Sequence, residues 1–477
     1  MSVTNPPQRT RLDVWRRRAA AIAAAASFLL AQRAFGEVSL ELDASVGEPP
    51  ALFSDGMVLQ RNATVPIWGK AAPGEHVSVT IGAQTKSTTT PADGHWRVVL
   101  DPIAAGGPYQ VVISGSNTIL LSDVLVGDVW VCAGQSNMVI RRARRSDLEL
   151  YPTIRTIGIG GRWSDRPSAV AFAFAQEIQA AFGVPIGIIN RAAGGTAIRG
   201  WLPPSVVADP DPDVQAIVGN WETFGEYYAK QIAPFAGYAI HGFVWWQGEQ
   251  DLKLSRQEAG TVDRYYYLLP ALIRSWRAEW QRGNLPFVFV QLPTGGGLQL
   301  GENVTPLPAT PPEPTIAVLM RRATFNGLSE PSTALTVSID IEGGTHPRDR
   351  ALYGHRIANA ARGTAYGQVF AYSGPIYSSM TIESGNRIRL RFKPNTAAGL
   401  HAEGGPLQGF AISADGENFV WAQAQIQNNN EVVVWNDAIA SPSVVRYGWD
   451  REPTWANLFN GAGLGTAPFS TEEVPAP

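Results

Sequence analysis

The sequence predicts an α/β fold in which a mostly parallel sheet is sandwiched by helices and flanked by an all-β, sandwich-like module at each end. Two observations carry this prediction. Strand-like and helical stretches alternate over residues 124–364, whereas short runs with period-two alternation occupy residues 37–123 and 365–477. Glycine (48 residues) and proline (35 residues) are plentiful, which favours many turns over long helices.

The composition excludes several classes of function. The net charge of −3 over 477 residues gives no electrostatic basis for binding nucleic acid or an anionic membrane. Cys132 is the only cysteine, so no intramolecular disulfide can form. No HExxH, CxxC or paired His/Cys spacing occurs, and we therefore expect neither a metal nor a cofactor.

Residues 1–36 are expected to form a signal peptide. An arginine-rich start precedes the apolar stretch AAAIAAAASFLLA at residues 19–31, which is too short to span a bilayer comfortably. Small residues follow at Ala34 and Gly36, where cleavage is plausible. The alternative is an N-terminal membrane anchor. We expect an exported protein, periplasmic or secreted, with no membrane attachment after processing.

The segment before residue 124 is expected to be a small β-sandwich. Its apolar runs alternate with period two and are separated by AAPGE, PADG and AAGGP, which are turn sequences; the runs are TVPIWG, HVSVTI, HWRVVL and YQVVIS.

From residue 124 onward, five buried-strand runs are predicted, at 124–133, 184–190, 242–247, 286–292 and 334–341. Helices are expected between them, at 168–183 with Gly183 as the C-terminal cap, at 262–283 closed by Gly283, near 313–328 and at 348–361. Such alternation indicates a parallel sheet covered on both faces. The Pro/Gly-rich segment 293–313 is long enough to be a lid.

The carboxyl ends of the predicted strands carry polar groups that can act together. Ligands bind at this edge of an open parallel sheet, so residues that follow each strand should meet there. Ser136 follows the first strand and needs a base to become a nucleophile. Of the six histidines, only His346 follows a strand in a Gly-rich loop on that edge, which makes it the candidate base.

The same edge offers donors for a developing oxyanion. Gly194 and Gly195 follow the second strand, and without a Cβ their backbone amides can approach a ligand closely. The amide of Ser136, near a helix start, can add a second donor. Gln247 can supply a third through its side chain. These groups together are what acyl transfer from an ester requires.

Seven sequence blocks resemble the sialate O-acetylesterase-like branch of the SGNH/GDSL hydrolases: LFSDGMVLQR, VPIWGKAAPGE, GDVWVCAGQSNM, AAGGTAIRGW, WWQGEQD, THPRDR and VRYGW with WANLFN. The resemblance spans nearly the whole chain after residue 36. It implies an SGNH-type fold and removal of O-acetyl groups from carbohydrates by a serine nucleophile without a metal. Ser136, the Gly194–Gly195 segment, Gln247 and His346 match the family's positions.

The sequence departs from the family near the base. Many members carry an aspartate two residues before the histidine, where this chain has Gly344. Asp340 matches another acid often seen in the family and is our choice to orient His346. Glu342 is the nearer alternative, and a Ser–His pair steadied by a backbone carbonyl is a third.

The resemblance predicts an acetylated carbohydrate substrate, either sialic acid or a plant-wall polysaccharide such as xyloglucan or xylan. Trp201 is the tryptophan most expected to present its ring to a sugar. Two other classes stay open: a carbohydrate-binding protein without activity, and a glycosidase that uses Glu249 and Asp251 as paired carboxylates. The sequence gives no indication of oligomeric state.

Overall fold

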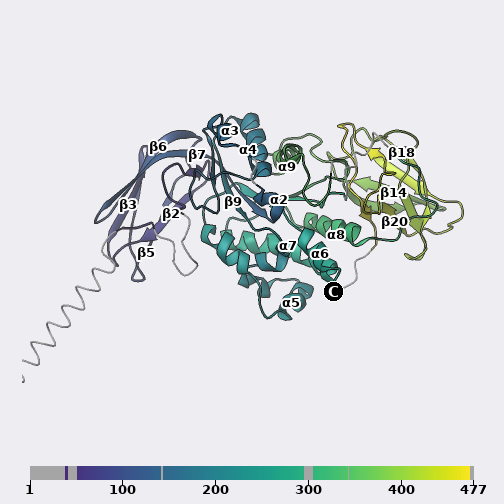
Figure 1. Ribbon diagram of the computed structural model, residues 1–477, viewed down its shortest axis with the longest axis horizontal. Helices are drawn as coiled ribbons and strands as arrows, with labels where there is room; N and C mark the ends of the chain where they lie inside the picture. Colours follow the sequence, from purple (N-terminus) through teal and green to yellow (C-terminus); the bar gives the residue numbers. More distant parts are fainter. Residues whose placement is uncertain (1–37, 41–50, 141–142, 295–303, 342, 473–477) are drawn as a thin grey trace, which may run out of the picture.

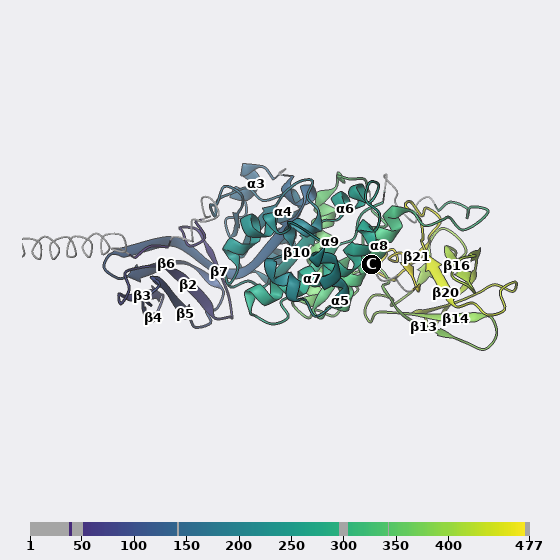
Figure 2. The same ribbon diagram turned by 90° about the horizontal axis from the view of Figure 1, so that it is seen from below.

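The computed structural model describes residues 38–40, 51–140, 143–294, 304–341 and 343–472. A β module, an α/β region and a second β module follow one another along the long axis of the molecule (Figures 1 and 2). The expected signal peptide and the central part of the expected lid, residues 295–303, lie outside these ranges. Among the described helices, none is long and apolar enough to cross a membrane.

The central part of the largest sheet is parallel, as predicted. Its strands follow the order β8-β9-β7-β10-β11-β12, and each neighbouring pair runs in the same direction. The bounds are β7 Thr118–Gly134, β8 Ile154–Ile157, β9 Ile186–Ala192, β10 Gly242–Trp246, β11 Phe287–Val290 and β12 Thr333–Thr336. The four-residue edge strand β8 was not predicted from the sequence. The strand expected at 334–341 is shorter and ends at Thr336.

Helices cover both faces of the parallel region (Figure 1). Trp130 and Cys132 of β7 pack with α4 (Ala169–Phe182) and α9 (Arg350–Thr364), whereas the alternate residues Val129 and Val131 face the cluster that contains α7 (Thr261–Trp280). Burial on both faces explains why these strands read as continuous apolar runs. Smaller helices add to the α7 side; they are α5 Pro212–Gly219, α6 Glu249–Leu254 and α8 Ile316–Phe325.

The predicted helix ends are only partly correct. The Ser168 hydroxyl caps the start of α4 by accepting a hydrogen bond from Ala171, and Gly183 closes the helix in the left-handed conformation. α7, however, ends at Trp280 and is capped by Gln281, which itself adopts the left-handed conformation. Gly283 lies in the turn beyond this cap.

One strand joins the N-terminal module to the parallel sheet. The first half of β7 pairs antiparallel with β6 (Gly106–Ser114), and its second half pairs parallel with β9 and β10. The change occurs near Asp123, which has a φ of 56°. The expected domain boundary between residues 123 and 124 therefore falls inside β7.

The N-terminal module packs two layers against each other. One layer continues the large sheet through β6, β3 (His76–Ile81) and β4 (Gln84–Thr89), and the other pairs β2 (Val65–Lys70) with β5 (His95–Leu100). Every second residue of β5 is buried, as period-two alternation predicts. A short strand, β1 (Val58–Gln60), runs parallel to β7.

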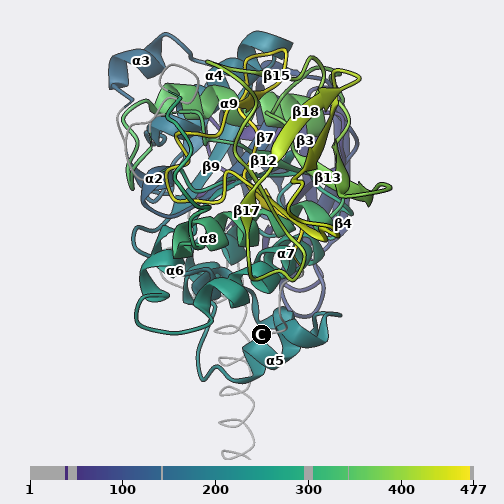
Figure 3. The ribbon, with the colours of Figure 1, turned by 90° about the vertical axis from the view of Figure 1, so that its right-hand side faces the viewer.

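The C-terminal module contains two four-stranded antiparallel sheets around its own apolar core (Figure 3). The first sheet has the order β13 (Tyr377–Ile382), β14 (Arg387–Phe392), β19 (Glu431–Trp435) and β18 (Gln423–Gln427). The second has the order β17 (Val420–Trp421), β16 (Phe410–Ser413), β20 (Val444–Tyr447) and β22 (Phe469–Ser470). A two-stranded pair, β15 (His401–Ala402) with β21 (Leu458–Phe459), completes the described part of the module.

Candidate active site

The chain turns sharply where β7 ends. Gly134 has a φ of 136°, and a Cβ at this position would lie 2.0 Å from the carbonyl oxygen of Trp246 on β10. Only glycine tolerates this combination of conformation and close approach. The N–H of Gln135 donates to the same carbonyl, and Ser136 begins the short helix α2 (Ser136–Val139). The corner therefore presents Ser136 at the carboxyl edge of the sheet.

Ser136 and His346 meet across this edge. Oγ of Ser136 lies 2.9 Å from Nε2 of His346, although the two residues are 210 positions apart. The imidazole is exposed and the serine is half-buried. A hydroxyl within hydrogen-bond reach of an imidazole nitrogen can transfer its proton during nucleophilic attack.

Asn137 fixes the loop that carries the imidazole. The amide nitrogen of this fully buried side chain donates to the carbonyl oxygen of Thr345 at 3.0 Å and to Oε1 of Glu249 at 2.8 Å. Asn137 was not among the predicted site residues. Its place directly after the serine, within GQSN, was the signal that could have identified it.

Glu249 has an unusual electrostatic environment. Burial disfavours its charged form and raises the pKa of the carboxyl to about 7, although the hydrogen bond from Asn137 acts in the opposite direction. Oε2 is buried and has no hydrogen-bond partner among the described residues. Near neutral pH both protonation states of Glu249 are therefore populated.

Gly194 and Gly195 form the turn after β9, beside the serine. A Cβ at Gly194 would lie 3.8 Å from Cβ of Ser136, and the residue is exposed. The N–H of Gly194 donates to no backbone group in the described part of the chain. Gly195 has a φ of 70°, which turns the chain away from the sheet. These positions suit the expected oxyanion donors, which stay a prediction.

The prediction that the Gln247 side chain donates to an oxyanion is not supported by its position. The side chain is buried, and the amide nitrogen donates to the carbonyl oxygen of Thr196 at 2.8 Å and to the carboxylate of Asp251. With its N–H groups used inside the protein, Gln247 supports the turn after Gly195 and is not free to bind an oxyanion.

Asp251 is also a supporting residue. Besides Gln247, its carboxylate accepts a hydrogen bond from the N–H of Ile198 at 3.1 Å. Burial raises the pKa of this carboxyl to about 6. Asp251 is buried, so it does not form with Glu249 the pair of accessible carboxylates that a glycosidase requires.

The expected sugar platform at Trp201 is wrong. Trp201 ends a short 3-10 helix (Ile198–Trp201), is 0% exposed, and packs edge-to-face on Trp245. Its indole N–H donates to the hydroxyl of Thr196 at 2.9 Å. Trp201 therefore belongs to the core beneath the site.

The carboxylate of Asp340 is bonded to groups other than the proposed base. It lies in a turn after β12, and its carboxylate forms an ion pair with Arg356 of α9 at 2.7 Å. Ser136 is the only hydrogen-bond partner of the His346 imidazole among the described residues. The expectation that Asp340 orients His346 is thus contradicted, because a cation on the neighbouring helix engages it. Glu342 lies outside the described residues.

A serine hydroxyl within reach of an imidazole, at the carboxyl edge of a helix-covered parallel sheet, is the arrangement of an SGNH-type hydrolase.

Comparison with known proteins agrees with this class. The family described as carbohydrate esterase, sialic acid-specific acetylesterase, matches residues 164–340. A carbohydrate acetylesterase of known structure from Xanthomonas citri is 32% identical, with a TM-score of 0.73, over 89% of this chain and 99% of that chain. The sialate O-acetylesterase of Homo sapiens is 28% identical over 68% of this chain and 72% of the human protein.

The chain therefore belongs to the sialic acid-specific acetylesterase family of carbohydrate esterases, and it is a carbohydrate acetylesterase of the SGNH type. The family resemblance inferred from the sequence blocks is confirmed.

Proposed function

We propose that this enzyme removes O-acetyl groups from carbohydrates through an acyl-enzyme on Ser136, with His346 as the general base. The observation that carries the proposal is the 2.9 Å distance between Oγ of Ser136 and Nε2 of His346. The accessibility of both residues supports it further, because an ester must reach the hydroxyl.

In the first half of the reaction, Oγ attacks the acetyl carbonyl while Nε2 of His346 takes the hydroxyl proton. The amides of Gly194 and Ser136 stabilise the oxyanion that develops. Collapse of the tetrahedral intermediate breaks the ester bond. The sugar oxygen takes the proton from His346 and leaves as a hydroxyl, and the acetyl group stays on Ser136.

In the second half, water attacks the acetyl-enzyme and gives its proton to His346. The bond to Oγ then breaks, Oγ recovers the proton, and acetate is released. Asn137 positions the base indirectly by holding the carbonyl of Thr345. Orientation of the imidazole through the backbone of its own loop takes the place of Asp340.

Replacing the proposed nucleophile tests this mechanism. Ser136→Ala should lower kcat/KM for p-nitrophenyl acetate by roughly 10³-fold or more, with unchanged circular dichroism and thermal unfolding. A serine-directed fluorophosphonate should add its mass to the wild type and not to the variant. Ser205→Ala, which removes an exposed hydroxyl bonded to Glu279, is the control. Retained activity in Ser136→Ala would overturn the proposal.

We also propose export of the enzyme, on the strength of the arginine-rich start and the short alanine-rich stretch within residues 1–36. Mass spectrometry of the protein recovered from the periplasm or the medium should find a new N-terminus near residue 36. An intact N-terminus in the recovered protein would contradict cleavage.

A further inference from the structure

The loop that carries the proposed base is held by a second contact. The N–H of Gly344, two residues before His346, donates to the carbonyl oxygen of Thr294 at 2.6 Å. A Cβ at Gly343 would lie 2.0 Å from the same oxygen, so only glycine allows the loop to approach this closely. The segment that follows β11 therefore holds the loop in addition to the clamp made by Asn137.

Arg321 of α8 fixes the position of this segment. Its side chain is buried, and its guanidinium donates to the carbonyl oxygens of Leu292 and Pro293 at 3.1 Å each. Both carbonyls directly precede Thr294, so the peptide groups bonded to Arg321 adjoin the one that binds Gly344. Burial lowers the pKa of Arg321 to about 10, and the guanidinium is therefore still charged at neutral pH, where carbonyl oxygens stabilise its charge.

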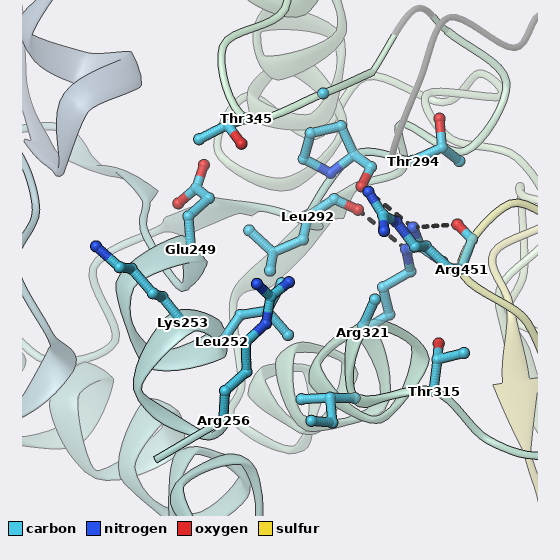
Figure 4. A pocket seen from close by; sticks show the side chains of 14 residues that line it. Glu249, Leu252, Lys253, Arg256, Leu292, Thr294, Thr315, Arg321, Thr345 and Arg451 are labelled. Atoms are coloured by element: carbon cyan, nitrogen blue, oxygen red, sulfur yellow. Dashed lines mark hydrogen bonds between the residues drawn. The ribbon is translucent and has the colours of Figure 1, made fainter. Parts of the chain in front are cut away.

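The same guanidinium reaches the C-terminal module. It donates to the carbonyl oxygen of Asp450 at 2.8 Å and to that of Arg451 at 2.9 Å. Figure 4 shows Arg321 between Leu292 on one side and Arg451 on the other. Arg321 thus joins three parts of the chain: α8, the segment after β11 and the C-terminal module.

A second contact joins the C-terminal module to the segment that carries the base. The N–H of Gly465 donates to the carboxylate of Asp340 at 3.4 Å. Arg321 and Thr345 line one cavity of about 460 Å³, which places the contacts of Arg321 beside the proposed catalytic pair (Figure 4). The C-terminal module therefore contacts residues 340–346 directly at their start and, through Arg321, indirectly near their end.

We propose that Arg321 is a positioning residue for catalysis: by tying residues 292–294 to the C-terminal module, it sets the position of the loop that presents His346 to Ser136. The inference rests on the proposed function and deepens it, because the C-terminal β module becomes part of the structure that orients the base. Lysine cannot replace Arg321, since a single ammonium group lacks the planar fork that reaches carbonyl oxygens on two sides. Displacement of a catalytic group by about 1 Å can cost roughly 10²-fold in rate.

Matched lysine substitutions at two buried arginines test the proposal. Arg321→Lys is compared with Arg277→Lys. Arg277 is also buried and donates to backbone carbonyl oxygens, those of Leu285, Pro331 and Ser332, but these residues precede β11 and β12 and lie at the opposite edge of the sheet. Both substitutions should lower the Tm, so a difference in kcat between the two variants reports the position of the base and not general stability.

We expect Arg321→Lys to lower kcat for p-nitrophenyl acetate by about 10- to 100-fold well below its Tm, with KM within about threefold of the wild type. The rate of labelling by a fluorophosphonate should fall by a similar factor, because labelling also requires the Ser136–His346 pair. Arg277→Lys should keep kcat within about twofold. Unchanged kcat and labelling in Arg321→Lys, or equal losses in both variants, would overturn the proposal.

Gly343→Ala provides a second test that does not depend on the folding of Arg321→Lys. The added methyl group would press on the carbonyl of Thr294 and shift the same loop, so kcat should fall by about 10-fold or more. If Arg321 acts through this contact, Arg321→Lys/Gly343→Ala should lose less kcat than the product of the two single losses, whereas Arg277→Lys/Gly343→Ala should show the product. An unchanged kcat in Gly343→Ala, or multiplied losses in the Arg321 double variant, would contradict this route.

Failure of the inference and failure of the proposed function give different results. A wild type that releases no acetate from p-nitrophenyl acetate and is not labelled at Ser136 would overturn both. An active wild type whose kcat is unaffected by Arg321→Lys would overturn the positioning role alone.

Discussion

Asn137 donates a hydrogen bond of 3.0 Å to the carbonyl oxygen of Thr345, the residue that precedes the proposed base. The residue after the proposed nucleophile thus holds the loop of its partner. Because the same amide also reaches Glu249, three separate parts of the chain meet at one buried side chain. The geometry of the Ser136–His346 pair depends on this junction.

Removal of the Asn137 amide should weaken catalysis. Asn137→Ala leaves the Thr345 carbonyl and the Glu249 carboxyl without their donor, so we expect a stability loss of about 1–3 kcal/mol. We also expect kcat for p-nitrophenyl acetate to fall about 10²-fold, because small displacements of a catalytic group are costly. Urea unfolding and steady-state kinetics measure both effects. Asn220→Ala, at an exposed helix end, is the control, and an unchanged kcat in Asn137→Ala would contradict the positioning role.

Glu249 should make the protein less stable as the pH rises. Its pKa is raised from 4.5 to about 7 in the folded protein, so the folded state binds the proton more tightly than the unfolded chain does. The stability gained from this protonation is complete below pH 4.5 and is lost as the pH rises through about 7. Glu249→Gln removes this dependence and should keep an acceptor for Asn137.

Urea unfolding at pH 6 and pH 8 measures the effect. The wild type should lose more stability between these two values than Glu249→Gln does. Asp251, with a pKa of about 6, is present in both proteins, so its contribution cancels in the comparison. Parallel pH profiles for the two proteins would show that Glu249 is charged throughout this range.

Asp340 should matter for stability more than for catalysis. Asp340→Asn leaves Arg356, which is 9% exposed, without its counter-charge, and breaking such a buried pair typically costs about 3–5 kcal/mol. We expect a lower Tm and a kcat within about tenfold of the wild type. The double variant Asp340→Asn/Arg356→Gln should recover part of the Tm. A severe loss of kcat at unchanged Tm would instead restore Asp340 as the acid that orients His346.

Alanine substitutions at the two adjacent glycines should affect different properties: activity at Gly194 and stability at Gly195. At Gly194 an added methyl group would contact Ser136 without a clash, so Gly194→Ala should fold but obstruct the space above the nucleophile. We expect kcat/KM to fall by about 10²-fold, because the methyl group displaces the ester from the nucleophile and small displacements are costly, although the backbone N–H is retained.

At Gly195 an added methyl group would meet no atom within 4 Å, but the φ of 70° is strained for alanine. Gly195→Ala should therefore lose about 1 kcal/mol of stability with little change in activity. Kinetics and thermal unfolding of both variants make the comparison. Equal kcat/KM losses would contradict a specific role for Gly194.

The sequence was sufficient to predict how Ser136 and His346 meet, because both follow parallel strands and the carboxyl ends of such strands share one edge. The partners of Asp340 and Gln247 depend on side-chain direction. Arg356 lies on a helix 16 residues beyond Asp340, and no local pattern indicates that the two form an ion pair. Only tertiary packing determines such contacts.

Trp201 illustrates the same limit. Its block, AAGGTAIRGW, follows a catalytic-edge strand, which suggested a surface ring. The 3-10 helix that ends at Trp201 turns the indole inward, against Trp245.

Because β7 continues without interruption from the N-terminal module into the parallel sheet, the stabilities of these two regions are coupled. Residues 118–134 contribute to the antiparallel ladder at one end and hold the corner before Ser136 at the other. A cut at residue 124 would divide β7. Neither the N-terminal module nor the parallel sheet can therefore unfold or be removed without disrupting a strand of the other. The N-terminal module and the α/β region should accordingly unfold in one calorimetric transition. A chimaeric protein joined at residue 124 should not yield a folded enzyme.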